Sequence, residues 1–215
     1  MRFNIEKEVD SKVSGKLEEW EQREDQLPSF VKLHRELLHI QSEVKSRVIV
    51  TKPSLAEGSV PDRLRDGVPL LSFKDFSPDW DEVLRVFEKI VLWATKDSED
   101  PSGESKNLSN IARNRSLLKK VATAWYQGHS LTSVTRARSV DIELLNSIVG
   151  AALKPFMFAY SRLLLPEVDQ ELWRRGYCPI CGGRPDFAFL DKERGARWLL
   201  CGRCERQQNL RLGTP

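Results

Sequence analysis

The sequence predicts a mainly α-helical protein, with a helical body over residues 1–174 and a small metal-binding β-hairpin module over residues 175–215. Two observations predict this division. Apolar residues recur every three or four positions along most of the chain, which is the spacing of one face of an α-helix. All four cysteines then lie in the last 38 residues, as two Cys-x2-Cys pairs flanking two short runs of strand-forming residues.

Two helices are predicted before residue 50. The first covers residues 5–20, and the second begins at Pro28 and ends near Val48. Each carries one apolar stripe, so each has one face to bury. The stripe residues are Ile5, Val9, Val13, Leu17 and Trp20 in the first helix, and Phe30, Leu33, Leu37, Leu38 and Val44 in the second.

Residues 51–77 are predicted to be an extended connector rather than a regular element, because prolines and glycines recur through them. A helix to about Thr95 follows. Its start signals are Ser77 as the cap, Pro78 at the first position and acidic residues in the first turn, where the helix dipole favours negative charge. Polar residues 96–106 then predict an exposed loop.

The rest of the body predicts three more helices. One covers residues 105–127 and ends at Gly128; two others cover residues 140–153 and 155–174. Pro155 is expected to kink or separate the last two, because proline lacks the amide donor and obstructs the preceding turn. The most apolar stretch, residues 149–165, is interrupted by Lys154, Pro155 and Arg162, so no membrane insertion is expected. The N-terminus lacks the features of a secretory signal, and the expected compartment is the cytoplasm.

The metal-binding module over residues 175–215, called the ribbon below, is predicted to be a β-hairpin. Residues 187–190 and 196–200 are strand candidates, and the polar residues 191–195 between them form a turn. Each outer end carries one pair of cysteines. Pro179 stiffens the first pair, while Gly182 and Gly183 allow positive φ after it. Gly202 is expected to play a similar part in the second pair.

The cysteines are predicted to bind one metal ion per chain. Thiolates are soft anionic donors that suit tetrahedral zinc or iron, and the 19 residues between the pairs fit a four-cysteine zinc ribbon. A redox dithiol is disfavoured because no thioredoxin-like βαβ pattern surrounds either pair. A catalytic metal is disfavoured because four thiolates leave no open coordination position. Zinc and iron are not distinguished by these ligands. The metal ligands are therefore Cys178, Cys181, Cys201 and Cys204.

No catalytic or cofactor-binding residue is nominated, and the protein is not expected to be an enzyme. His34 and His39 are five positions apart and so do not share a helix face, and His129 follows the helix end at Gly128, where a cation is favourable. The sequence contains neither a phosphate-binding glycine-rich loop nor a nucleophile elbow.

The charge pattern gives weak support for nucleic-acid binding. The net charge is only +3, but residues 171–215 hold nine Lys or Arg against five acids, a local balance of +4. Basic zinc ribbons bind nucleic acids. Aromatic residues that could stack on bases are sparse, however, and acidic residues lie between the basic ones along the hairpin. Nucleic-acid binding is therefore kept as the alternative function.

Four segments carry a family resemblance. Residues 173–185 read Trp-Arg-Arg-Gly-Tyr-Cys-Pro-Ile-Cys-Gly-Gly-Arg-Pro, and residues 195–204 read Gly-Ala-Arg-Trp-Leu-Leu-Cys-Gly-Arg-Cys. Residues 66–71 read Asp-Gly-Val-Pro-Leu-Leu, and residues 151–155 read Ala-Ala-Leu-Lys-Pro. Together they resemble the formate dehydrogenase accessory proteins (FdhE family), in which a helical body leads into a Cys-Pro-x-Cys-Gly-x-x-Pro ribbon. The likeness covers most of the chain and is sharpest around the cysteines.

The resemblance implies an accessory role. Family members are cytoplasmic, hold metal in rubredoxin-like ribbons, and contact the catalytic subunit of formate dehydrogenase to make it active. They also continue into a second cysteine ribbon, whereas this sequence ends as Arg-Leu-Gly-Thr-Pro over residues 211–215. We therefore expect the second ribbon to be missing. Three functions stay open: a formate dehydrogenase maturation protein, a zinc-ribbon nucleic-acid-binding protein, and a truncated family copy without function. The sequence does not predict an oligomeric state.

Overall fold

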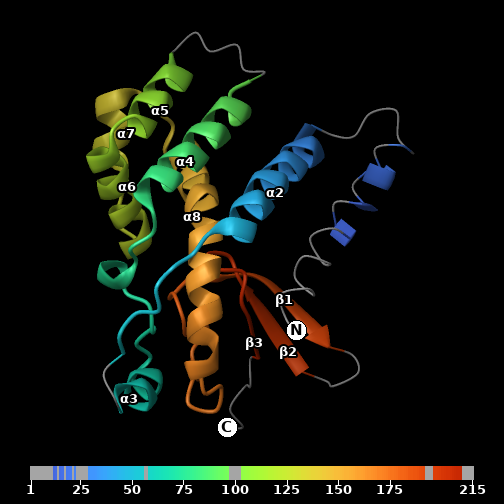
Figure 1. The fold of residues 1–215 in the computed structure, drawn as a ribbon, viewed down its shortest axis with the longest axis vertical. Coiled ribbons are helices and arrows are strands. Elements are labelled where there is room, and N and C mark those ends of the chain that lie inside the picture. Colours follow the sequence, from blue (N-terminus) through green and yellow to red (C-terminus); the bar gives the residue numbers. More distant parts are fainter. Residues whose placement is uncertain are drawn as a thin grey trace.

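The computed structural model confirms a mainly helical fold that ends in a small antiparallel sheet (Figure 1). It describes residues 12–13, 15–16, 18–20, 22, 29–55, 58–96, 103–191 and 196–209. The helix predicted over residues 5–20 lies largely outside this part of the chain; the residues of it that are described are helical. Of the turn predicted over residues 191–195, only Asp191 is described, as the last residue of a strand; the C-terminal residues 210–215 also lie outside the described part.

The described helices are α2 (Ser29–Arg47), α3 (Ser59–Asp66), α4 (Trp80–Ala94), α5 (Glu104–Ala112), α6 (Arg115–Gln127), α7 (Thr132–Arg138) and α8 (Ile142–Leu164). Two single-turn 3-10 helices are η1 (Phe73–Asp75) and η2 (Leu165–Glu167). The strands β1 (Pro185–Asp191), β2 (Ala196–Cys201) and β3 (Gln207–Asn209) form an antiparallel sheet in the order β1-β2-β3. The hairpin of β1 and β2 was predicted, and β3 was not.

Helix α8 is the central element of the body. It packs against α2, α4 and α6, and its buried residues include Val149, Phe156 and Tyr160 (Figure 1). The helical stretch Ile142–Glu167 is long and apolar enough to cross a membrane by composition alone. More than half of its most apolar window, 56%, is buried against the rest of the protein, as in the core helix of a folded domain.

Pro155 does not separate two helices, which corrects the prediction of separate helices over residues 140–153 and 155–174. Helix α8 continues through it as one element of 23 residues. Proline leaves the carbonyl of the residue four positions earlier, Ala151, without its usual helical donor. The side-chain amide of Gln41 on α2 replaces that donor, because its Nε2 donates to the Ala151 carbonyl at 2.9 Å. Gln41 is buried, so this hydrogen bond also fixes α2 against α8.

The predicted connector over residues 51–77 contains a regular element, which is a second correction. Helix α3 occupies residues 59–66, bounded by Gly58 and Gly67, which both adopt the left-handed conformation that favours glycine. Pro61 lies in its first turn, where the helix needs no amide donor. The glycines and proline therefore mark the ends and start of a short helix rather than its absence.

Capping chemistry explains two further differences. Asp79, not Ser77, caps α4, because its carboxylate accepts hydrogen bonds from the amides of Asp81 and Glu82. The helix predicted over residues 105–127 is two helices, since the side chain of Asn114 accepts from the Leu117 amide and starts α6. The helix predicted to continue to residue 174 ends in η2. Helix α7 was not predicted.

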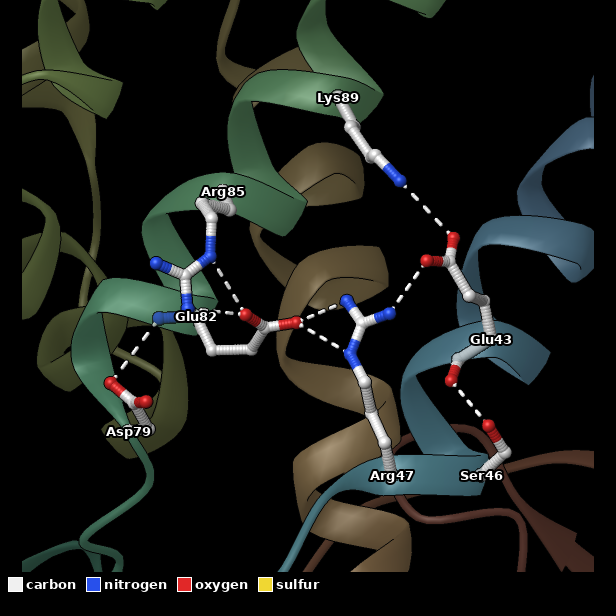
Figure 2. A network of polar contacts seen from close by, with 7 residues as sticks. All are labelled: Glu43, Ser46, Arg47, Asp79, Glu82, Arg85 and Lys89. Atoms are coloured by element: carbon white, nitrogen blue, oxygen red, sulfur yellow. Dashed lines mark hydrogen bonds and ion pairs between the residues drawn. The ribbon is translucent and has the colours of Figure 1, made fainter.

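An ion-pair network joins α2 to α4 on the surface (Figure 2). Arg47 at the end of α2 bridges Glu43 on its own helix and Glu82 on α4. Lys89 of α4 pairs with Glu43 at 3.1 Å, and Arg85 pairs with Glu82 at 2.5 Å. Burial raises the pKa of Glu82, but hydrogen bonds from Arg47 and Arg85 outweigh it and hold the pKa below its usual 4.5. Hydrogen bonds from Arg47 and Lys89 likewise lower the pKa of Glu43.

This network predicts a loss of stability in acid. A carboxyl whose folded pKa is depressed stabilises the fold above its unfolded pKa, near 4.5, and loses that contribution as pH falls through the folded pKa. In Arg47→Met, Glu82 keeps its burial but loses one partner. The free energy of unfolding, measured in urea at pH 7 and at stepwise lower pH, should therefore fall less steeply below pH 4.5 than in the wild type.

The matched control is Arg65→Met, which removes an exposed ion pair with Asp62 within α3 alone. It should keep the wild-type acid dependence. An Arg47→Met protein with unchanged acid dependence would show that the bridge contributes nothing to the pH profile.

Candidate metal centre

The fold brings the four predicted cysteines together. The first pair precedes β1, the second lies at the end of β2, and antiparallel pairing places Pro185 opposite Cys201. All four sulfur atoms lie within 4.8 Å of one another. The Sγ atoms of Cys178 and Cys204 are 3.6 Å apart, and those of Cys181 and Cys201 are 3.5 Å apart. These separations exceed the S–S bond of a disulfide, about 2.05 Å, so the cysteines are free.

The sulfur geometry fits a tetrahedral ion. With metal–sulfur bonds of about 2.3 Å, the edge of a tetrahedron of sulfurs is about 3.8 Å, which lies within the observed spread. All four side chains are buried. Without an ion, hydrogen bonds with neighbouring thiols and burial raise the pKa of Cys181 and Cys204. Metal binding must therefore displace protons, and four thiolates then close the coordination shell.

The two cysteine pairs form matching turns, which we call the first knuckle (residues 178–183) and the second knuckle (residues 201–206). In the first, the Gly182 amide donates to the Cys178 carbonyl and the Cys178 amide to the Gly183 carbonyl, each at 2.9 Å. In the second, the same two bonds run from Glu205 to Cys201 and from Cys201 to Arg206, also at 2.9 Å. The repeated hydrogen bonds point both pairs of sulfurs at one centre.

The glycines serve these knuckles differently from the prediction. Gly182 has φ of 70°, as expected, but the equivalent left-handed residue of the second knuckle is Glu205, with φ of 56°. Gly183 is needed for space instead, whereas a Cβ at Gly202 would meet the carboxylate of the exposed Asp186, which can move away. A Cβ at Gly183 would lie 2.8 Å from the Cys201 sulfur, and a Cβ at Gly202 would lie 2.2 Å from a carboxylate oxygen of Asp186.

The first knuckle binds the connector between α3 and η1. The amides of Leu70 and Leu71 donate to the carbonyls of Pro179 and Ile180, at 2.9 and 2.7 Å. The Tyr177 hydroxyl donates to the Gly67 carbonyl at 2.7 Å. These bonds join segments about 110 residues apart, so the knuckle fixes a connector that has little regular structure of its own.

The second knuckle binds three helices. Arg203 contacts the end of α6, where it donates to the carbonyls of Tyr126 and Trp125. Glu205 pairs with Lys45 of α2 at 2.5 Å and lies 3.9 Å from Lys154 of α8. Arg206 donates to Ser161 of α8 at 2.9 Å. The metal centre therefore lies between the ribbon and the body. Sequence reasoning missed these anchoring residues, because their partners are distant in the chain.

The three histidines, which were not nominated as site residues from the sequence, lie apart from this centre. His34, His39 and His129 are exposed, and among the described residues the four cysteines are the group whose atoms could hold a metal. His129 contributes its backbone amide to the end of α6, where it donates to Ala124. The boundary predicted near residue 174 stays a prediction. Trp173 and the cysteines share one cluster of buried residues with the helices.

Comparison with known proteins gives one distant relative. The FdhE homolog of Aquifex aeolicus is 23% identical to this chain over 171 residues, which are 78% of this chain and 55% of that protein. The chain thus spans about half the length of the curated relative that it matches. No family model and no solved structure matches the chain. The similarity supports a distant relationship to FdhE proteins.

The segments that resemble this family meet at the metal centre. Residues 66–71 bind the first knuckle through Gly67, Leu70 and Leu71. Residues 151–155 supply Lys154, which faces Glu205 of the second knuckle. Segments that lie far apart in the sequence thus meet around one set of four sulfurs.

Proposed function

We propose that this protein is an accessory protein that binds the catalytic subunit of a formate dehydrogenase and supports its assembly or activation. The observation that carries the proposal is the convergence of the FdhE-like segments on one buried four-cysteine centre. The distant similarity to an FdhE homolog supports it. On this proposal the protein acts in the cytoplasm and is not an enzyme.

The chemistry of the site agrees with a role in binding rather than catalysis. Zinc or iron would be held by Cys178, Cys181, Cys201 and Cys204. A bound ion would cross-link the two knuckles. Four buried thiolates leave no coordination position for substrate. The residues around them, such as Arg203 and Glu205, hold the ribbon on the helices instead of facing a substrate cavity.

Co-purification tests this function directly. Tagged protein is expressed with the catalytic subunit of a formate dehydrogenase from the same organism, and the subunit is expected to be retained. Ser139→Ala, at an exposed position at the end of α7, serves as a surface control that keeps binding. A protein that folds and holds metal but retains no subunit, and leaves formate dehydrogenase activity unaffected when deleted, would contradict the proposal. That result would favour a family copy without function.

One observation favours nucleic-acid binding as the second candidate. Phe187 and Phe189 alternate on one face of β1 and are 69% and 42% exposed. Arg184 and Arg197 on the same hairpin are exposed as well. Exposed aromatic rings beside cations are the groups that stack and pair with single-stranded nucleic acids.

Fluorescence anisotropy with a labelled single-stranded oligonucleotide separates the two candidates. Binding that weakens steeply with salt, and that is lost in a Phe187→Ser, Phe189→Ser double variant, would support the nucleic-acid candidate. Retention of the formate dehydrogenase subunit with no salt-sensitive oligonucleotide binding would support the first candidate.

A further inference from the structure

Arg203 occupies an unusual place for a long cationic side chain. It lies between the two ligands of the second knuckle, and its guanidinium carbon is 4.9 Å from the centre of the Trp125 ring and 5.3 Å from that of Tyr126. It also donates to the carbonyls of Tyr126 and Trp125 at 3.1 and 3.4 Å. These carbonyls belong to the last turn of α6, where the helix dipole favours a cation.

The stem of Arg203 is fixed as well as its head. A Cβ placed on Gly183 would lie 2.9 Å from the Arg203 Cγ atom, so the first knuckle packs closely against this side chain. The planar guanidinium can stack on rings and donate to two carbonyls at once, which a lysine ammonium cannot reproduce. The geometry thus uses features specific to arginine.

Tyr126 provides a second connection, to the first knuckle. Its hydroxyl donates to the Leu71 carbonyl at 2.6 Å, and the Leu71 amide donates to the Ile180 carbonyl at 2.7 Å. Arg203 extends from the second knuckle and Ile180 lies in the first, so both connections end on the last turn of α6. A metal ion bound by the two knuckles would close this path into a ring.

Because of this ring, the structure assigns Arg203 and Tyr126 a positioning role. Through these two residues, metal binding at the four cysteines makes the C-terminal end of α6 more ordered. The inference does not rest on the identity of the partner. It goes beyond the proposed function, because it names a part of the helical surface that responds to the metal.

Hydrogen exchange measured with and without a chelator tests the role. In the wild type, removal of the metal should speed exchange of the Gly128 and His129 amides, which bond to Trp125 and Ala124, by roughly tenfold or more. Arg203→Met and Tyr126→Phe should each reduce this response, and the double variant should abolish it. The Leu70 amide bonds directly to the first knuckle, so its response should remain in Arg203→Met.

Three comparisons keep the result interpretable. Arg184→Met removes an exposed arginine beside the first knuckle and should behave as the wild type. Arg203→Lys keeps the charge without the planar fork and should recover only part of the response. Cobalt bound in place of the native metal should show the same thiolate absorption in every variant, which confirms intact coordination.

Either of two outcomes would overturn the inference. The double variant could retain a full metal response at residues 128 and 129, or residues 70–71 could lose their response in parallel with them. The second pattern would indicate general destabilisation of the ribbon. If the double variant does not fold, the two single variants and Arg203→Lys decide the question by the same comparison of the two segments.

Discussion

Cys201→Ser is expected to release the metal and to unfold residues 177–209. A bound structural zinc contributes an apparent free energy of about 10–16 kcal/mol to small metal-binding domains. The second knuckle contacts α2 through Glu205 and α6 through Arg203. Elemental analysis should show less than one equivalent of metal, and hydrogen exchange should show loss of protection throughout β1 and β2.

The helical body is expected to respond less. Helix α8 contacts α2, α4 and α6 directly, and these contacts do not pass through the cysteines. The far-UV circular dichroism of Cys201→Ser should therefore keep most of its helical signal, while the melting temperature falls because Ile180 and the cysteines no longer cover the core. This comparison tests the boundary predicted near residue 174.

Chelation of the wild-type protein provides the matched experiment. It should produce the same partial unfolding, and addition of zinc or iron should reverse it. Full loss of helical signal in one transition with the ribbon would show that residues 1–174 and 175–215 form one cooperative unit. If Cys201→Ser kept the metal content and the melting temperature of the wild type, no four-thiolate site would exist.

The sequence was most informative where structure depends on neighbouring residues. The Cys-x2-Cys turns and the two strands between them are local patterns, and their spacing predicted a cluster that the structure brings within 4.8 Å. The left-handed Gly128 at the end of α6 is another local signal that was interpreted correctly.

Errors arose where a distant residue compensates a local rule. Pro155 disfavours a continuous helix by itself, and nothing near it in the sequence shows that Gln41 supplies the missing donor. Glu205 adopts a left-handed conformation more typical of glycine, and it is held there between Lys45 and Lys154. Arg203 was counted only as part of a basic segment, because its partners lie about 77 residues earlier in the chain.

Competing caps caused the smaller errors. Ser77, Asp79 and Asn114 are all good helix caps by residue type, and the sequence does not decide which of them begins a helix. In the folded protein Asp79 caps α4, and the Ser77 amide donates to the Tyr160 hydroxyl of α8. Residue type alone therefore does not select the residue that caps a helix.

Gly183→Ala is expected to weaken metal binding by about 10- to 100-fold, the usual effect of disturbing the residues that support a metal ligand. The added methyl group would lie 2.8 Å from the Cys201 sulfur and 2.9 Å from the Arg203 Cγ atom, closer than such atoms approach. One of the two must move. If the sulfur moves, the tetrahedron is distorted; if Arg203 moves, the second knuckle loses its contact with α6.

The control is Gly176→Ala, two residues before the first ligand. A Cβ there would meet no atom within 4 Å, and its φ is not in the left-handed range, so metal affinity should not change. Competition with a chromogenic chelator measures both variants, and Gly183→Ser should weaken binding further because its side chain is larger. Equal affinity in Gly183→Ala and Gly176→Ala would mean that the knuckles have room to separate. In that case the close contact between Gly183 and Cys201 would not be required for metal binding.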